Sequence, residues 1–147
     1  MKLPKQSFLA LAAIGWADGS LEPVEATGLL RAAREAGVAG DDLAEVEHAV
    51  KSKAALEAVD VSGMSSWDQV LTYALAAWLA QLDGVVSTSE KGPLAELANK
   101  LGLTEALRVR AAAAANDVAC LPGGGRPERY DFQKLAQRLK ERLPQVK

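Results

Sequence analysis

The sequence predicts a single all-α domain of about seven helices. Ala and Leu account for 28 and 21 of the 147 residues, and both are strong helix formers. The β-branched stock beyond Val is poor, with one Ile and four Thr, which disfavours a β-sandwich or a β-barrel. A chain of this length has room for one domain, and it can bury roughly two thirds of the surface that its unfolded form exposes.

Glycine and proline set the ends of the first two expected helices. An apolar segment over residues 5–17 forms the first helix, and it stops at Asp18-Gly19 because Gly supplies the left-handed exit. The second helix starts near Glu22-Pro23, with Pro in the first helical position, and it ends at Gly37.

A third helix is expected after a short connector. Asp41 or Asp42 is the residue that can cap it, because a carboxylate accepts hydrogen bonds from the free N–H groups of the first turn. This helix runs to about Ala58, and residues 59–66 form the loop that follows it.

The fourth helix is predicted to be the central helix of the core. Ser65 or Ser66 caps it, and it stops at Asp83-Gly84. Its apolar residues recur at spacings of three and four, as in a helix with one buried face. They are Trp67, Leu71, Ala74, Leu75, Trp78 and Leu82.

Two helices follow the second Asp-Gly pair. Residues 87–90 read Ser-Thr-Ser-Glu, a capping box that opens the fifth helix, which ends at Gly102. Thr104 caps the sixth helix, which continues through the alanine run 111–115.

A basic amphipathic helix over residues 131–147 is expected after a glycine-containing linker, residues 121–130. Asp131 caps it, and from residue 126 onward the chain has seven Lys or Arg against three Asp or Glu. Its apolar stripe consists of Phe132, Leu135, Leu139 and Leu143. We expect the stripe to dock on the body of residues 1–120, because soluble proteins rarely expose four large apolar groups together. The alternative is that the helix swings out onto an anionic membrane surface or an acidic partner.

The chain contains an internal repeat. Residues 12–40 align with residues 77–105 at a fixed offset of 65, and seven of the 29 positions are identical, where this composition would give roughly three by chance. Besides two alanines, the matching pairs are Asp18 and Asp83, Gly19 and Gly84, Glu25 and Glu90, Leu29 and Leu94, and Gly37 and Gly102. The sequence therefore predicts a duplicated helical hairpin, whose two copies would pack about a pseudo-twofold axis.

The two loop motifs carry a family resemblance. Residues 16–25, Trp-Ala-Asp-Gly-Ser-Leu-Glu-Pro-Val-Glu, and residues 82–90, Leu-Asp-Gly-Val-Val-Ser-Thr-Ser-Glu, resemble the tellurite-resistance protein TerB family. The resemblance covers about residues 9–116. It implies an all-helical, non-enzymatic module of the tellurite, metal or general stress response. It also implies that the acidic loops bind a divalent metal, and that the module works with other proteins in a membrane-associated assembly.

The loops offer oxygen ligands of the kind that Ca²⁺ or Mg²⁺ prefers. The first loop supplies Asp18, Glu22 and Glu25, and the second supplies Asp83 and Glu90. The alternative is that these carboxylates serve the helix ends alone, because negative charge in the first turn stabilises a helix without any metal. The functional alternative that follows is a metal-free helical adaptor or scaffold, which acts through protein–protein contacts.

Composition excludes several other classes of function. The formal net charge is −2, whereas a nucleic-acid-binding domain would be far more basic, so no nucleic-acid partner is expected. One Cys and one His leave few nucleophile–base pairs and no soft-metal site, so we expect no enzyme activity. No apolar run approaches the length that spans a bilayer, and we expect a cytoplasmic protein.

Overall fold

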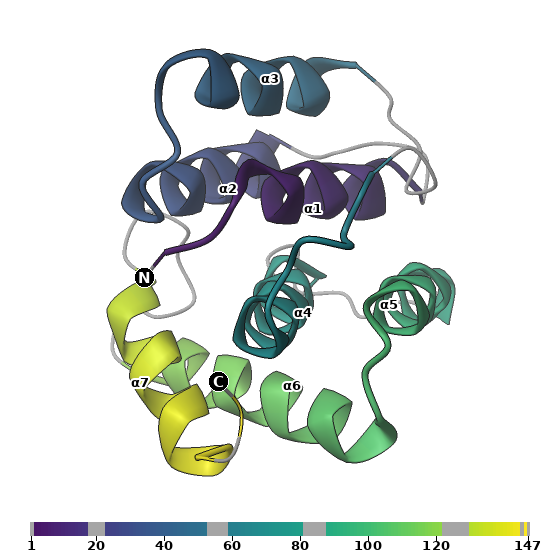
Figure 1. Ribbon diagram of the computed structural model, residues 1–147, viewed down its shortest axis with the longest axis vertical. Helices are drawn as coiled ribbons and strands as arrows, with labels where there is room; N and C mark the ends of the chain where they lie inside the picture. Colours follow the sequence, from purple (N-terminus) through teal and green to yellow (C-terminus); the bar gives the residue numbers. More distant parts are fainter. Residues whose placement is uncertain are drawn as a thin grey trace.

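Seven α-helices and no strand make up the part of the chain that the structure, a computed structural model, describes (Figure 1). That part comprises residues 2–17, 23–52, 59–80, 88–121, 130–144 and 146. The helices are α1 (Lys5–Ala17), α2 (Pro23–Glu35), α3 (Gly40–Lys51), α4 (Ser66–Ala80), α5 (Thr88–Leu101), α6 (Glu105–Ala119) and α7 (Phe132–Arg142). The predicted all-α class is confirmed.

The helices are stacked in levels along the long axis of the molecule. In Figure 1, α3 lies at one end over α1 and α2, α4 and α5 form the next level, and α6 and α7 lie at the other end. The helices α1 and α4 pack against each other in the middle, and α3 and α6 pack on their outer sides. Among the described helices, none is long and apolar enough to cross a bilayer.

The central position predicted for the fourth helix is confirmed. Leu71, Ala74 and Leu75 of α4 are completely buried, and Trp78 is 1% exposed. The long contact between α4 and α6 is possible because α6 presents Ala111, Ala114 and Ala115, all fully buried. Small side chains let the two helix backbones approach closely, so the alanine-rich composition is used where the core is densest.

Three of the predicted helix caps are confirmed by hydrogen bonds. The hydroxyl of Ser65 accepts from the Asp68 N–H at 3.1 Å, and that of Thr104 accepts from the Leu107 N–H at 3.3 Å. The carboxylate of Asp131 accepts from the N–H of residue 134 at 3.0 Å. Each bond satisfies an N–H that the helix itself cannot pair.

The third helix departs from its predicted bounds at both ends. It begins at Gly40, and Ala39 occupies the capping position without a side-chain hydrogen bond, so Asp41 and Asp42 lie in the first turn and are not caps. There their charge still interacts favourably with the helix dipole. The helix ends at Lys51, short of the expected Ala58, because the backbone of residue 52 is extended, and that residue is a serine, a weak helix former. Residues 53–58 lie outside the described part.

The ends of α2 and α5 have the same geometry at positions 65 residues apart. Gly37 and Gly102 have φ of +89° and +73°, the left-handed region in which glycine alone is unstrained. The next N–H donates back across the turn in both places, from Val38 to the Ala33 carbonyl and from residue 103 to the carbonyl of residue 98, each at 3.0 Å. These are Schellman ends, and the predicted glycine exits at Gly37 and Gly102 are confirmed. Gly19 and Gly84 lie outside the described residues.

The C-terminal helix packs against the body. The four residues of its apolar stripe, Phe132, Leu135, Leu139 and Leu143, are at most 1% exposed, and α7 contacts α6. The polar side of α7 faces solvent. Of the expected linker, residues 122–129 lie outside the described part.

Candidate functional site

Most of the predicted metal ligands lie where the structure describes no side chain. Asp18, Glu22 and Asp83 fall outside the described residues, and Glu90 belongs to α5 in a stretch whose side chains are not described. Glu25 lies in the first turn of α2, half-buried, and already takes part in a polar interaction. Within the described part, no three His, Cys, Asp or Glu residues group as metal ligands. The metal site therefore stays a prediction.

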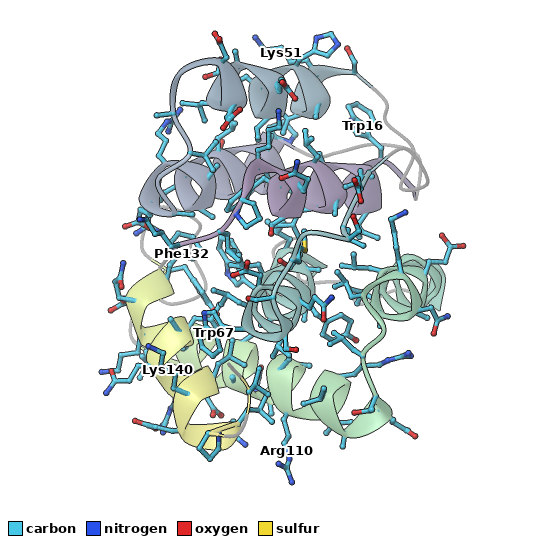
Figure 2. The ribbon with its side chains drawn as sticks, in the orientation of Figure 1. Trp16, Lys51, Trp67, Arg110, Phe132 and Lys140 are labelled. Carbon is cyan, nitrogen blue, oxygen red and sulfur yellow. The ribbon has the colours of Figure 1, made fainter. Side chains whose placement is uncertain are left out.

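The helix that leads into the first acidic loop is held in place. The indole Nε1 of Trp16 donates a hydrogen bond of 3.0 Å to the Ala49 carbonyl oxygen of α3 (Figure 2). Trp16 is half-buried and packs against the core, which fixes the end of α1 one residue before it stops.

A buried pair of hydroxyl groups joins α1 to α4 in the middle of the molecule. The Oγ1 of Thr72 lies 2.8 Å from the Oγ of Ser7 and 2.6 Å from the Asp68 carbonyl oxygen. Ser7 and Thr72 are both fully buried. One hydroxyl proton serves one acceptor, so Thr72 donates to the carbonyl and Ser7 donates to Thr72. The two residues are separated by 65 positions, the offset of the repeat.

An aromatic cluster receives the chain as it enters α7. The ring of Tyr130 stacks on Trp78 with 4.4 Å between centroids, and Phe132 meets Trp78 edge-on at 5.1 Å. The Tyr130 hydroxyl donates to the Ala115 carbonyl at 3.0 Å, and burial raises the pKa of this phenol far above its usual range. Arg31 of α2 completes the cluster: its Nη1 donates to the Tyr130 carbonyl at 2.6 Å, and its guanidinium lies 4.8 Å from the Phe132 ring centre.

The cationic face of α7 is partly paired with the body. Arg142 Nη2 lies 2.6 Å from a carboxylate oxygen of Asp117 on α6, and Arg138 reaches the same oxygen at 3.9 Å. The Lys140 ammonium lies 5.6 Å from the centre of the Trp67 ring. The two ion pairs with Asp117 are exposed enough for water to screen them, so they orient α7 more than they stabilise it.

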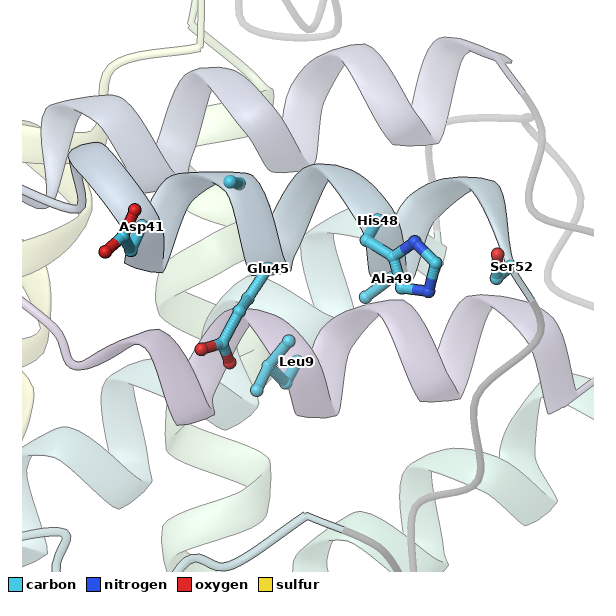
Figure 3. A pocket seen from close by; sticks show the side chains of 7 residues that line it. Leu9, Asp41, Glu45, His48, Ala49 and Ser52 are labelled. Carbon is cyan, nitrogen blue, oxygen red and sulfur yellow. The ribbon is translucent and has the colours of Figure 1, made fainter.

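A shallow groove of about 590 Å³ runs between α1 and α3 (Figure 3). Its apolar lining consists of Leu9, Ala44 and Ala49, and its polar rim includes Asp41, Glu45 and His48. We call this feature the α1–α3 groove. Sequence reasoning does not indicate this groove, because Leu9 and the residues of α3 come from different helices and neither helix carries a motif.

A lysine lies beside the acidic side of the α1–α3 groove. Lys5 Nζ is 3.0 Å from Glu45 and 3.5 Å from Asp42. The hydrogen bond to Glu45 raises the pKa of Lys5 above its ordinary value. One ammonium thus faces the carboxylates of Glu45 and Asp42, while Asp41, one residue earlier, is exposed. His48, which also lines the groove, is exposed.

Comparisons with known proteins found no relative. No family model matches the chain, and neither a curated protein nor a solved structure matches it.

Proposed function

We propose that the chain is a non-enzymatic helical module of the TerB-like type, built from two copies of one helical hairpin, whose two acidic loops bind a divalent cation. The motifs around Asp18 and Asp83 carry the resemblance. On this proposal the module acts in a tellurite, metal or general stress response, through other proteins.

The carrying observation is that helix boundaries repeat at the offset of the sequence repeat. Pro23 and Thr88 begin α2 and α5, and Gly40 and Glu105 begin α3 and α6, each pair 65 residues apart. The Schellman ends at Gly37 and Gly102 fall at the same offset. The helices before the two loops, α1 and α4, end at Ala17 and Ala80, 63 residues apart. The equal boundaries after the loops support a common origin of the two halves, and so a common role for the loops.

The Ser7–Thr72 hydrogen bond supports a pseudo-twofold relation between the halves. Equivalent residues of two related units touch each other only where the axis that relates them passes, as in an isologous dimer. Ser7 and Thr72 are equivalent by the offset and are in contact between α1 and α4. Such an axis would bring the loops around Asp18 and Asp83 into related positions.

Calorimetric titration of the metal-free chain with Ca²⁺ and Mg²⁺ tests the proposal. Binding to the native state raises thermal stability by mass action, so either ion at millimolar concentration should raise the melting temperature. Asp18→Asn and Asp83→Asn should each reduce this rise. Asp41→Asn, which removes an exposed carboxylate from α3, is the matched control and should keep it. No heat and no shift with either ion would refute the metal role.

The α1–α3 groove favours one second function, a metal-free adaptor. A partly apolar groove with a charged rim is the kind of surface that another protein can occupy. On this alternative the acidic residues of the loops stabilise the helix ends only, and the chain acts through the protein that its groove binds. Metal titration separates the two, because the adaptor predicts no response to either ion.

A further inference from the structure

The α1–α3 groove occupies a particular place in the repeat. It is lined from α1 and α3 alone, on the side away from α2 (Figure 3). At the offset of 65, its residues Leu9, Ala49 and Ser52 correspond to Ala74, Ala114 and Asp117 of the second half.

In the second half, α7 lies at one end of the corresponding place, the end nearest Asp117, whereas Val109, the equivalent of Ala44, is 62% exposed. Asp117 is the carboxylate that Arg142 of α7 contacts, and Ala74 and Ala114 are completely buried. In the first half, Leu9 is only half-buried, and no helix in the described part of the chain covers the groove. The end of the α1–α3 groove at Ser52 is therefore equivalent to a part of the seat of α7, without its helix.

We propose that the α1–α3 groove binds an amphipathic helix with basic flanks, supplied by a partner protein. The inference rests on the internal duplication proposed above, and it does not depend on metal. An apolar stripe on the partner helix would lie on Leu9, Ala44 and Ala49, as an amphipathic helix lies in a groove.

Charge complementarity identifies the flanks as basic. Three carboxylates, on Asp41, Asp42 and Glu45, stand at this side of α3, and one ammonium, on Lys5, is paired with two of them. The surplus is negative. The helix that lies at the equivalent of the Ser52 end, α7, is itself basic, with Lys134, Arg138, Lys140 and Arg142 against Glu141.

The probe is a fluorescent peptide with the sequence of residues 130–147, added to the full-length chain in EDTA so that metal plays no part. We expect saturable, salt-sensitive binding by fluorescence anisotropy. Amide shifts in NMR spectra should appear at Leu9, Ala44 and Ala49, and at the Trp16 indole, which donates to the Ala49 carbonyl. Shifts confined to α4 and α6 would mean that the peptide only exchanges with α7, and would overturn the proposal.

Two groove variants and a matched control complete the test. Ala44→Arg places a long cation in the groove at an exposed position, and should weaken peptide binding at least ten-fold. Asp41→Lys should weaken it roughly two- to five-fold, the size of one exposed ion pair lost. Glu96→Lys makes the same charge change on an exposed site of α5 and should leave the affinity unchanged.

A scrambled peptide of the same composition controls for charge alone. It should bind far more weakly, because it lacks the apolar stripe. The proposal would be overturned if the scrambled peptide bound equally well, or if Glu96→Lys weakened binding as much as Asp41→Lys. Either result would show general electrostatic attraction. Should Ala44→Arg fail to fold, as judged by its melting curve, Asp41→Lys and Glu96→Lys still decide the outcome.

Discussion

Replacing Leu139 of α7 with Ala measures how far the C-terminal helix belongs to the folded core. Leu139 is completely buried and lies in a core that continues into α4 and α6. Truncating such a leucine costs about 2–5 kcal/mol of unfolding free energy, from lost transfer energy and from the cavity left behind. For a chain of this length, about 1 kcal/mol lowers the melting temperature by about 2–4 °C. Leu139→Ala should therefore lower it by about 4–20 °C.

The assay is chemical and thermal unfolding, followed by circular dichroism. Lys140→Ala is the matched control: the neighbouring residue of α7 is exposed, and its loss removes an exposed cation–π contact with Trp67, which should change the unfolding free energy by no more than about 1 kcal/mol. The slope of the denaturant curve should be equal in both variants, because each still unfolds as one unit. If Leu139→Ala costs as little as Lys140→Ala, α7 is not a part of the cooperative core, and the reasoning fails.

Three further predictions test the hydroxyl pair, the buried phenol and the repeated helix ends. Thr72→Val should cost about 1–3 kcal/mol by leaving the buried Ser7 hydroxyl unpaired, and Ser7→Ala should cost less, because Thr72 still donates to the Asp68 carbonyl oxygen. The double variant should cost less than the sum of the two in denaturant unfolding, and additivity would contradict the contact. Burial raises the pKa of Tyr130, so the neutral buried phenol stabilises the fold fully below the unfolded-state pKa of about 10, and this contribution is lost as the pH rises above that value. Tyr130→Phe should therefore flatten the fall of the denaturant midpoint above about pH 10. Alanine at Gly37 or at Gly102 should lower the unfolding free energy by about 1 kcal/mol in both cases, since both have positive φ, and a neutral result at either would contradict its left-handed backbone.

Local features of the fold could be predicted from the sequence because a few neighbouring residues determine them. The cap at Thr104 needs only a hydroxyl ahead of a helix, and the exit at Gly102 needs only a residue that tolerates positive φ. The apolar stripe of α7 could be read from the spacing of Phe132 and three leucines, because the helical period places them on one face.

Features that depend on distant residues could not be predicted. The hydrogen bond from Ser7 to Thr72 follows from the packing of two helices, and neither residue type indicates it in the sequence. The end of α3 at Lys51 could not be predicted, because the sequence beyond it is still rich in helix formers, although the backbone of Ser52 is extended. The α1–α3 groove exists because no helix of the described chain covers Leu9, a property of topology and not of any motif.

The contact between Arg31 and Tyr130 has a consequence for biosynthesis. It joins residues 99 positions apart, and Tyr130 also covers Trp78 in the centre of the molecule. A ribosome makes the chain from its N-terminus, so α1 to α6 are synthesised before the residues that close over this tryptophan exist. The nascent protein must carry an uncovered aromatic surface until Tyr130 has emerged from the ribosome, and this interval is when chaperones, or a neighbouring copy, have most to bind.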